Sequence, residues 1–113
     1  MSFYALNLFD LAPNDLYRQY SRRSVAAVEK HGGRVVALGK LAGDAEPGGV
    51  EPRRVMVLVE WPDRAAFDAF LADPENGDLH PLREGGTQNY LWWLYEGLED
   101  LRPVFREQDV RGT

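Results

Sequence analysis

The order of the apolar segments along the chain constrains its fold more than any other feature. Four segments read as strands because they alternate, or are rich in β-branched and aromatic residues: 3–11, 34–41, 55–61 and 89–95. Helical patterns follow the first and the third of these segments. This β-α-β-β-α-β order predicts an α+β, ferredoxin-like split unit, with an antiparallel four-stranded sheet and its helices on one face.

An open sheet with helices on a single face leaves its other face without cover. In the first strand both sets of alternating side chains contain apolar residues: Phe3, Ala5, Asn7 and Phe9 on one side, and Tyr4, Leu6, Leu8 and Asp10 on the other. A strand that is apolar on two sides is typical of a sheet covered on both. We therefore expect a homodimer in which a second copy covers the free face.

The length and composition indicate a single domain. A chain of 113 residues holds one core, which we place at about residues 3–97, followed by a C-terminal arm over 98–113. The absence of cysteine excludes disulfides, thiolate metal sites and cysteine nucleophiles. No apolar run is long enough to span a bilayer and the first residues lack a signal-peptide pattern, so we expect a cytoplasmic protein that does not enter membranes.

The charge and the missing motifs exclude several classes of function. A net charge of −5, with arginines scattered among acids, disfavours nucleic-acid binding. There is no G-x-G-x-x-G, P-loop, H-E-x-x-H or G-x-S-x-G motif. With only two histidines, neither at metal-ligand spacing from a carboxylate, we expect no metal and no cofactor.

The first helix is expected to open after Pro13, with Asn14 as its cap, and to end at Gly32-Gly33. Its inward stripe has spacings of three and four: Leu16, Tyr20, Ser24, Ala27 or Val28, and His31. His31 stands at the negative end of this helix, where an imidazolium interacts favourably. We interpret His31 as a capping residue in preference to a catalytic one.

The second helix is expected to begin at a cap on Asp63 and to end at Asp73-Pro74. Its inward residues would be Ala66, Phe67, Phe70 and Leu71. Glycine-rich residues 43–49 predict a long, solvated and mobile hairpin loop between the second and third strands. Residues 98–105 carry apolar side chains at helical spacing and predict a short helix or arm laid on the partner, with 106–113 frayed.

Glu60 is the first candidate catalytic residue. Alternation places it on the same face as Met56 and Leu58 in the most apolar strand. Apolar neighbours raise the pKa of a carboxyl group, which suits a general base near neutral pH. The alternative of equal weight is a half-exposed carboxylate at the end of the strand.

His80 and Arg83 are the other two candidates. Residues 79–83 predict one helical turn that brings both side chains close to the sheet. Arg83 would hold a carboxylate or enolate oxygen, and His80 would move a proton. The alternative is structural: His80-Pro81 forms a turn, and Arg83 pairs with Glu60 or Glu84.

The fourth strand is rich in aromatic residues on both faces, with Tyr90 and Trp92 on one and Trp93 and Tyr95 on the other. One pair is expected to face the helices and the other the partner sheet. Tyr20, Tyr90 and Trp92 are the candidate substrate-binding residues. Aromatic side chains bury large areas, so core and dimer packing is the alternative to a ligand pocket.

Several of these segments together resemble the domain of unknown function 1330 family. They include 15–20, the 29–34 junction with its His31-Gly32-Gly33-Arg34 sequence, the strand end 57–62 followed by 64–67, and 79–83. This family belongs to the dimeric α/β-barrel superfamily. The resemblance spans residues 3–97 and implies two ferredoxin-like subunits with their sheets face to face, and a pocket between sheet and helices in each. It implies no catalytic residue.

Superfamily members include cofactor-free monooxygenases, decarboxylases, cyclases and dehydratases that act on aromatic or polyketide compounds. The resemblance therefore implies a protein that binds a small hydrophobic or aromatic molecule, and the candidate residues suit cofactor-independent acid–base chemistry. The alternative from another class is a non-catalytic dimeric module that stores, senses or scaffolds.

Overall fold

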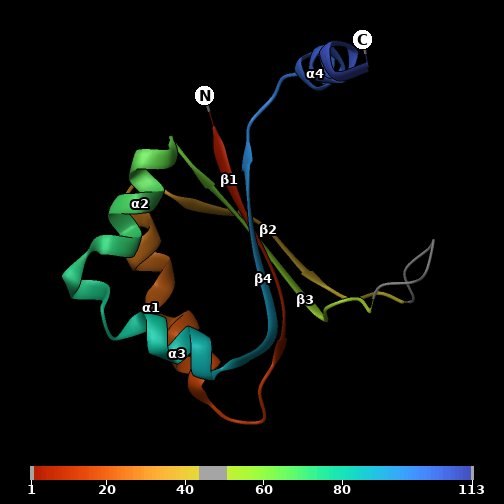
Figure 1. Ribbon diagram of the computed structural model, residues 1–113. Helices are drawn as coiled ribbons and strands as arrows, with labels where there is room; N and C mark the ends of the chain where they lie inside the picture. Colours follow the sequence, from red (N-terminus) through yellow and green to blue (C-terminus); the bar gives the residue numbers. More distant parts are fainter. Residues whose placement is uncertain (1, 44–50, 113) are drawn as a thin grey trace.

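The computed structural model describes residues 2–43 and 51–112 of the chain, so nearly all of the glycine-rich loop predicted at 43–49 lies outside the described residues. The elements in chain order are β1 (Phe3–Leu11), α1 (Leu16–Lys30), β2 (Arg34–Lys40), β3 (Val55–Trp61), α2 (Arg64–Ala72), a short 3-10 helix (Pro74–Asn76), α3 (Leu79–Gly85), β4 (Thr87–Glu96) and α4 (Arg102–Gly112). Figure 1 shows their arrangement.

The sheet confirms the predicted ferredoxin-like topology. Its strand order is β2-β3-β1-β4 and every neighbouring pair is antiparallel, so β2 and β4 form the edges. Helices α1, α2 and α3 lie on one side of the sheet, and its other side carries no helix packed flat against it (Figure 1). We call this second side the open face.

The core lies between the sheet and the helices. In β1 burial alternates residue by residue, with Phe3, Ala5, Asn7 and Phe9 buried, which confirms that these four residues share one face and identifies it as the face toward the helices. The largest fully buried side chains are Trp61, Phe9, Phe70 and Leu79. Because these come from β1, β3, α2 and α3, a single core joins the sheet to the helical layer.

Polar side chains fix both ends of α1. The N-cap of α1 is Asp15, one residue after the predicted cap, but Asn14 does accept a hydrogen bond from the Leu16 N–H (2.9 Å) and donates one to the Gly85 carbonyl (3.0 Å), which ties α1 to α3. At the other end Gly32 takes a φ of +82°, a conformation natural to glycine. His31 is the C-cap, and its Nε2 donates to Asp73 Oδ2 at 2.8 Å. His31 therefore joins the end of α1 to the end of α2.

Helix α2 begins and ends where the sequence predicts. Asp63 accepts a hydrogen bond from the Ala66 N–H at 2.8 Å, and Phe67 and Phe70 are buried. The prediction that Leu71 points inward is wrong, because its side chain is 37% exposed. With only nine residues, α2 presents a narrow stripe to the sheet, and Leu71 lies beyond its edge.

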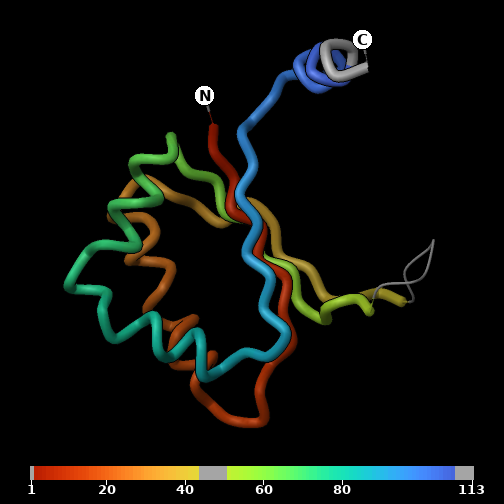
Figure 2. Tube along the Cα trace, in the orientation of Figure 1, coloured from red at the N-terminus to blue at the C-terminus, as the bar shows by residue number. Residues whose placement is uncertain are grey.

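The C-terminal segment differs from its prediction. Helix α4 begins at Arg102, whose N–H donates to Asp100 Oδ1 at 2.9 Å, and it continues to Gly112 through residues predicted to be frayed. It stands clear of the sheet and the other helices (Figures 1 and 2). The apolar side chains of this segment are exposed: Leu98, Leu101, Val104 and Phe105.

None of the helices in the described part of the chain has the length and apolar character to cross a membrane.

Candidate functional site

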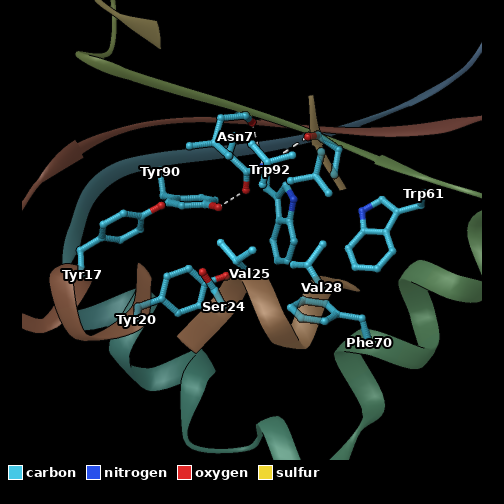
Figure 3. Close-up of a pocket in the computed structure, with 14 residues that line it drawn as sticks. Asn7, Tyr17, Tyr20, Ser24, Val25, Val28, Trp61, Phe70, Tyr90 and Trp92 are labelled. Atoms are coloured by element: carbon cyan, nitrogen blue, oxygen red, sulfur yellow. Dashed lines mark hydrogen bonds between the residues drawn. The ribbon is translucent and has the colours of Figure 1, made fainter. Parts of the chain in front are cut away.

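A cavity of about 50 Å³ lies between the sheet and the helical layer (Figure 3). Strands β1, β3 and β4 form its roof, and α1 and α2 form its floor. Alanine and valine side chains make up much of the wall, and the remaining lining residues are aromatic or polar: Asn7, Tyr17, Tyr20, Ser24, Trp61, Phe70, Tyr90 and Trp92. The space is therefore mainly apolar and aromatic, the usual character of a small-molecule site.

A wider groove of about 690 Å³ adjoins this cavity, between α1 and the β2–β3 side of the sheet. The two spaces share Tyr17, Ser24, Val25, Val35 and Val57 as lining residues. We call them the inner cavity and the outer groove, and together the chamber. The groove is large enough for a multi-ring compound, whereas the inner cavity has room for a small group only.

Asn7 is the buried polar residue of the roof. Its Nδ2 donates to the carbonyl oxygens of Val57 (3.0 Å) and Ala5 (3.3 Å), and its Oδ1 accepts a hydrogen bond from the Tyr90 hydroxyl. These bonds pair both ends of the amide. They also fix the phenol of Tyr90 at the cavity wall (Figure 3).

Three tyrosines, Tyr17, Tyr20 and Tyr90, bring phenol groups to the chamber. Burial raises the pKa of Tyr17 to about 12, and it also raises the pKa of Tyr20 and of Tyr90. In each case the positive charge of Arg83 opposes part of the rise. All three phenols consequently stay protonated at neutral pH, and all three experience a nearby cation.

That cation is buried. The Arg83 side chain is 9% exposed, and its guanidinium carbon lies 4.5 Å from the centroid of the Trp92 ring. Its Nη1 lies 3.1 Å from Nδ1 of His80, and its Nη2 lies 3.8 Å from Glu84, whose side chain is 72% exposed. Arg83 therefore sits behind the aromatic wall with no buried carboxylate among these partners.

The contact with Arg83 fixes the state of His80. An arginine only donates hydrogen bonds, so Nδ1 of His80 must accept, and a neutral His80 carries its proton on Nε2. Nε2 is buried and has no hydrogen-bond partner among residues 2–43 and 51–112. The imidazole also packs edge to face against Phe70, at a ring separation of 5.9 Å.

The structure brings most of the predicted site residues together. Tyr20, Tyr90 and Trp92 line the inner cavity, while His80 and Arg83 lie directly behind its wall. The predicted pairing of Arg83 with Glu84 is present, at 3.8 Å. The helical turn predicted at 79–83 is confirmed as part of α3.

Glu60 does not belong to this group. The predicted alternation with Met56 and Leu58 is correct, but that set of side chains lies on the open face, paired across the sheet with Leu8, Leu6 and Tyr4. Glu60 accepts hydrogen bonds from Arg34 Nε (2.9 Å) and the Tyr4 hydroxyl (3.0 Å). These bonds lower the pKa of Glu60. The predictions of a raised pKa and of a pairing with Arg83 are both wrong.

Sequence reasoning missed Trp61 and the role of Asn7. Asn7 was detectable as the polar member of an otherwise apolar inward set in β1. Trp61 follows Glu60 and therefore alternates onto the opposite, helix-covered face. Within the described ranges no three His, Asp or Glu side chains come together in a way that could hold a metal ion.

Comparison with solved structures shows where this fold occurs. A protein of unknown function from Rhodopseudomonas palustris is similar with a TM-score of 0.78 at 23% identity, over 88% of this chain and 84% of the other. SnoaB, a cofactor-independent oxygenase from Streptomyces nogalater, is similar with a TM-score of 0.60 at 16% identity, over 89% and 97%. A dimeric ferredoxin-like protein of unknown function from Jannaschia is similar with a TM-score of 0.61 at 13% identity, over 86% of this chain and 100% of the other.

At these identities the similarity establishes the fold alone. A comparison with curated proteins found no match. The model of a family described as a domain of unknown function, DUF1330, matches residues 2–97, and this chain therefore belongs to the DUF1330 family.

Proposed function

We propose that this protein binds a small aromatic or polyketide-like compound in the chamber and performs an acid–base step on it without a cofactor. The observation that carries the proposal is the environment of Arg83. This buried cation lies beside an aromatic cavity, and its carboxylate partner, Glu84, is exposed to solvent. A buried charge is costly unless it is paired. A bound compound with negative charge on oxygen would supply the missing partner.

Arg83 would act on that charge through the cavity wall. It does not line the cavity, but it stacks on Trp92 and its field reaches Tyr17, Tyr20 and Tyr90. A fixed positive field in an apolar site stabilises an enolate or phenolate more than its neutral parent. This difference favours transfer of a proton from the bound compound to a water molecule in the outer groove, which is open to solvent.

His80 would assist this step as a hydrogen-bond donor to the developing negative charge, and not as the base that takes the proton. Its Nδ1 is held by Arg83, so the neutral ring offers a proton at Nε2 and cannot rotate without losing this contact. Among the described residues that line the inner cavity there is no Asp or Glu. Glu60, on the open face, has no part in the proposed chemistry and is a natural control.

The comparisons support the same class of activity. SnoaB is described as a cofactor-independent oxygenase and is similar in fold to this chain. The Jannaschia protein is described as dimeric, and the apolar residues on the open face of this chain suit the same kind of assembly. We include a homodimer, with the open faces in contact, in the proposal.

The test is native mass spectrometry of protein freshly purified from its host, followed by assays on variants. We expect a co-purified aromatic compound at one per subunit. Arg83→Ala should weaken binding and turnover of that compound about tenfold or more, because the positive field that favours its negative charge is lost. His80→Ala should lower turnover more than binding.

Glu60→Gln should leave both binding and turnover unchanged. Full binding and turnover in the Arg83→Ala and His80→Ala variants would refute the site assignment. A ligand-free dimer that binds no aromatic compound would instead favour a scaffold role.

A further inference from the structure

Two buried indole N–H groups at the wall of the inner cavity have no hydrogen-bond partner in the part of the chain that the structure describes. They belong to Trp61, which is 2% exposed, and to Trp92. Both side chains line the inner cavity, and the nitrogen-bearing edges of the two rings are turned toward one another in Figure 3. Buried N–H groups are rarely left unpaired, because no hydrogen bond in the folded protein then replaces the ones they made to water.

Two charged or polar side chains behind the wall of the inner cavity, Arg83 and His80, also offer donors. An indole donates and cannot accept, an arginine only donates, and His80 carries its proton on Nε2 in the tautomer fixed by Arg83. The amide of Asn7 is already occupied by Val57, Ala5 and Tyr90. Among the described residues, the buried polar atoms left unpaired at and behind the wall of the inner cavity, the two indole nitrogens and Nε2 of His80, are therefore all donors.

The position of Arg83 strengthens one of these donors. Its guanidinium lies over the face of Trp92, 4.5 Å from the ring centroid. A cation over the ring draws electron density toward itself. The indole N–H consequently becomes a better donor toward an anionic acceptor.

We infer that Trp61 and Trp92 form a binding site for an anionic oxygen group, a carboxylate or an enolate, carried by an aromatic ligand. The oxygen group occupies the inner cavity between the two indole nitrogens, and the ring system occupies the outer groove. This matches the sizes of the two spaces, about 50 Å³ and about 690 Å³. The inference rests on the chamber of the proposed function and specifies its ligand.

The test is a titration followed by NMR of ¹⁵N-labelled protein, which reports each indole N–H separately. The sequence has three tryptophans, and Trp93 lies on the open face and lines neither the inner cavity nor the outer groove, so its signal is an internal control. The probes are 2-naphthoate, which presents a carboxylate, the anion of 2-hydroxy-1,4-naphthoquinone, which presents an enolate, and 2-naphthylmethylamine. The amine has a similar ring system but offers donors in place of acceptors.

We expect at least one anionic probe to move the Trp61 and Trp92 indole signals downfield, to leave Trp93 unchanged, and to bind more tightly than the amine. The probe that binds more tightly distinguishes a carboxylate site from an enolate site. Trp92→Phe should weaken that probe about tenfold, the size of one hydrogen bond to a charged group, while Trp93→Phe should not. If Trp61→Phe fails to fold, the wild-type titration and Trp92→Phe still carry the test.

Equal affinity for the amine and the anions would overturn the inference, as would unchanged indole signals at saturation, which would mean that a buried water alone pairs with the two groups. A probe that perturbs Tyr20 and Tyr90 but neither indole would overturn the inference and leave the proposed function standing. Pairing of both indoles with a probe, together with full activity of Arg83→Ala and His80→Ala, would overturn the proposed function and leave the inference standing.

Discussion

Charged side chains in this protein differ in how fully the fold supplies them with partners. Asp73 accepts hydrogen bonds from Lys30 Nζ (3.0 Å), His31 Nε2 (2.8 Å) and the Glu75 N–H (2.9 Å). Together they hold the pKa of Asp73 at about 2, well below its usual value of 3.8, with the bond from Lys30 as the largest cause. Asp73 is thus a structural junction between α1 and the end of α2, in contrast to Arg83.

The Asp73 junction predicts a pH dependence of stability. The folded pKa is lower than the unfolded one, so the stability from this carboxylate is present above pH 3.8 and is lost as the pH falls through about 2. Asp73→Asn should lower the melting temperature at pH 7, and its difference from wild type should shrink below about pH 4. Thermal unfolding followed by circular dichroism between pH 7 and pH 2 measures both effects.

The exposed Asp68, which lies 3.4 Å from Arg64, provides the control. Asp68→Asn should have a small effect, because exposed ion pairs contribute little. A constant difference between Asp73→Asn and wild type at every pH would contradict the assignment.

Residue patterns predict which side chains share a face, but not which face the helices cover. Glu60 and Trp61 are neighbours in a strand that is apolar on both sides, so its sequence does not indicate which of the two faces lies against the helices. The structure resolves it by packing Trp61 against Phe67 and Phe70 from α2. A tertiary contact therefore determines that Trp61, and not Glu60, reaches the cavity.

Among the secondary-structure elements, those with strong local signals are predicted almost to the residue. Strands β1 and β3 and the capped starts of α1 and α2 depend on alternation and on side chains next to them in the chain. Helix α4 is predicted too early, because Leu98 and Leu101 carry the spacing of a helix without its cap. Pro103 lies in the first turn of α4, a position that proline favours and that the sequence could have revealed.

The close approach of α1 to Gly86 leads to a second prediction. Gly86 joins α3 to β4, and a Cβ there would overlap the backbone nitrogen of Tyr17 and lie 2.8 Å from the Leu82 carbonyl oxygen. Gly86→Ala should lower the free energy of unfolding by about 1–3 kcal/mol or more, since backbone atoms cannot move aside cheaply. Urea unfolding measures the change.

Gly43→Ala is the matched control, because no atom of residues 2–43 or 51–112 lies within 4 Å of the added methyl group. Its effect should stay within about 0.5 kcal/mol. If the two substitutions proved equally harmless, the approach of α1 to this junction would be looser than the structure indicates.

At the scale of the whole molecule, the open face carries two apolar rows that run across all four strands. Each row joins side chains opposite one another in the sheet: Gly39, Met56, Leu8 and Leu91 in one, and Ala37, Leu58, Leu6 and Trp93 in the other. A third row is polar, with Arg34 and Glu60 beside Tyr4 and Tyr95. Apolar surface of this extent is typical of an interaction site, and the proposed homodimer would bury it.

Trp93 lies in the second apolar row and tests this assembly. Trp93→Glu should convert the dimer to a monomer, because an unpaired carboxylate would be buried in the interface. Light scattering coupled to size-exclusion chromatography measures the mass. Ala26→Glu places the same carboxylate on the exposed side of α1 and should leave the dimer intact.

A wild-type protein that is monomeric at micromolar concentration, or a Trp93→Glu variant that remains dimeric, would contradict the proposed interface.

Helix α4 stands apart from the packed body, and it follows the stretch of residues 2–97 that matches the family. The chain is thereby divided into a part in which substitutions must respect a shared core and a part that is released from this constraint. Substitutions at the exposed residues of α4 can therefore accumulate without repacking the core or changing the lining of the chamber.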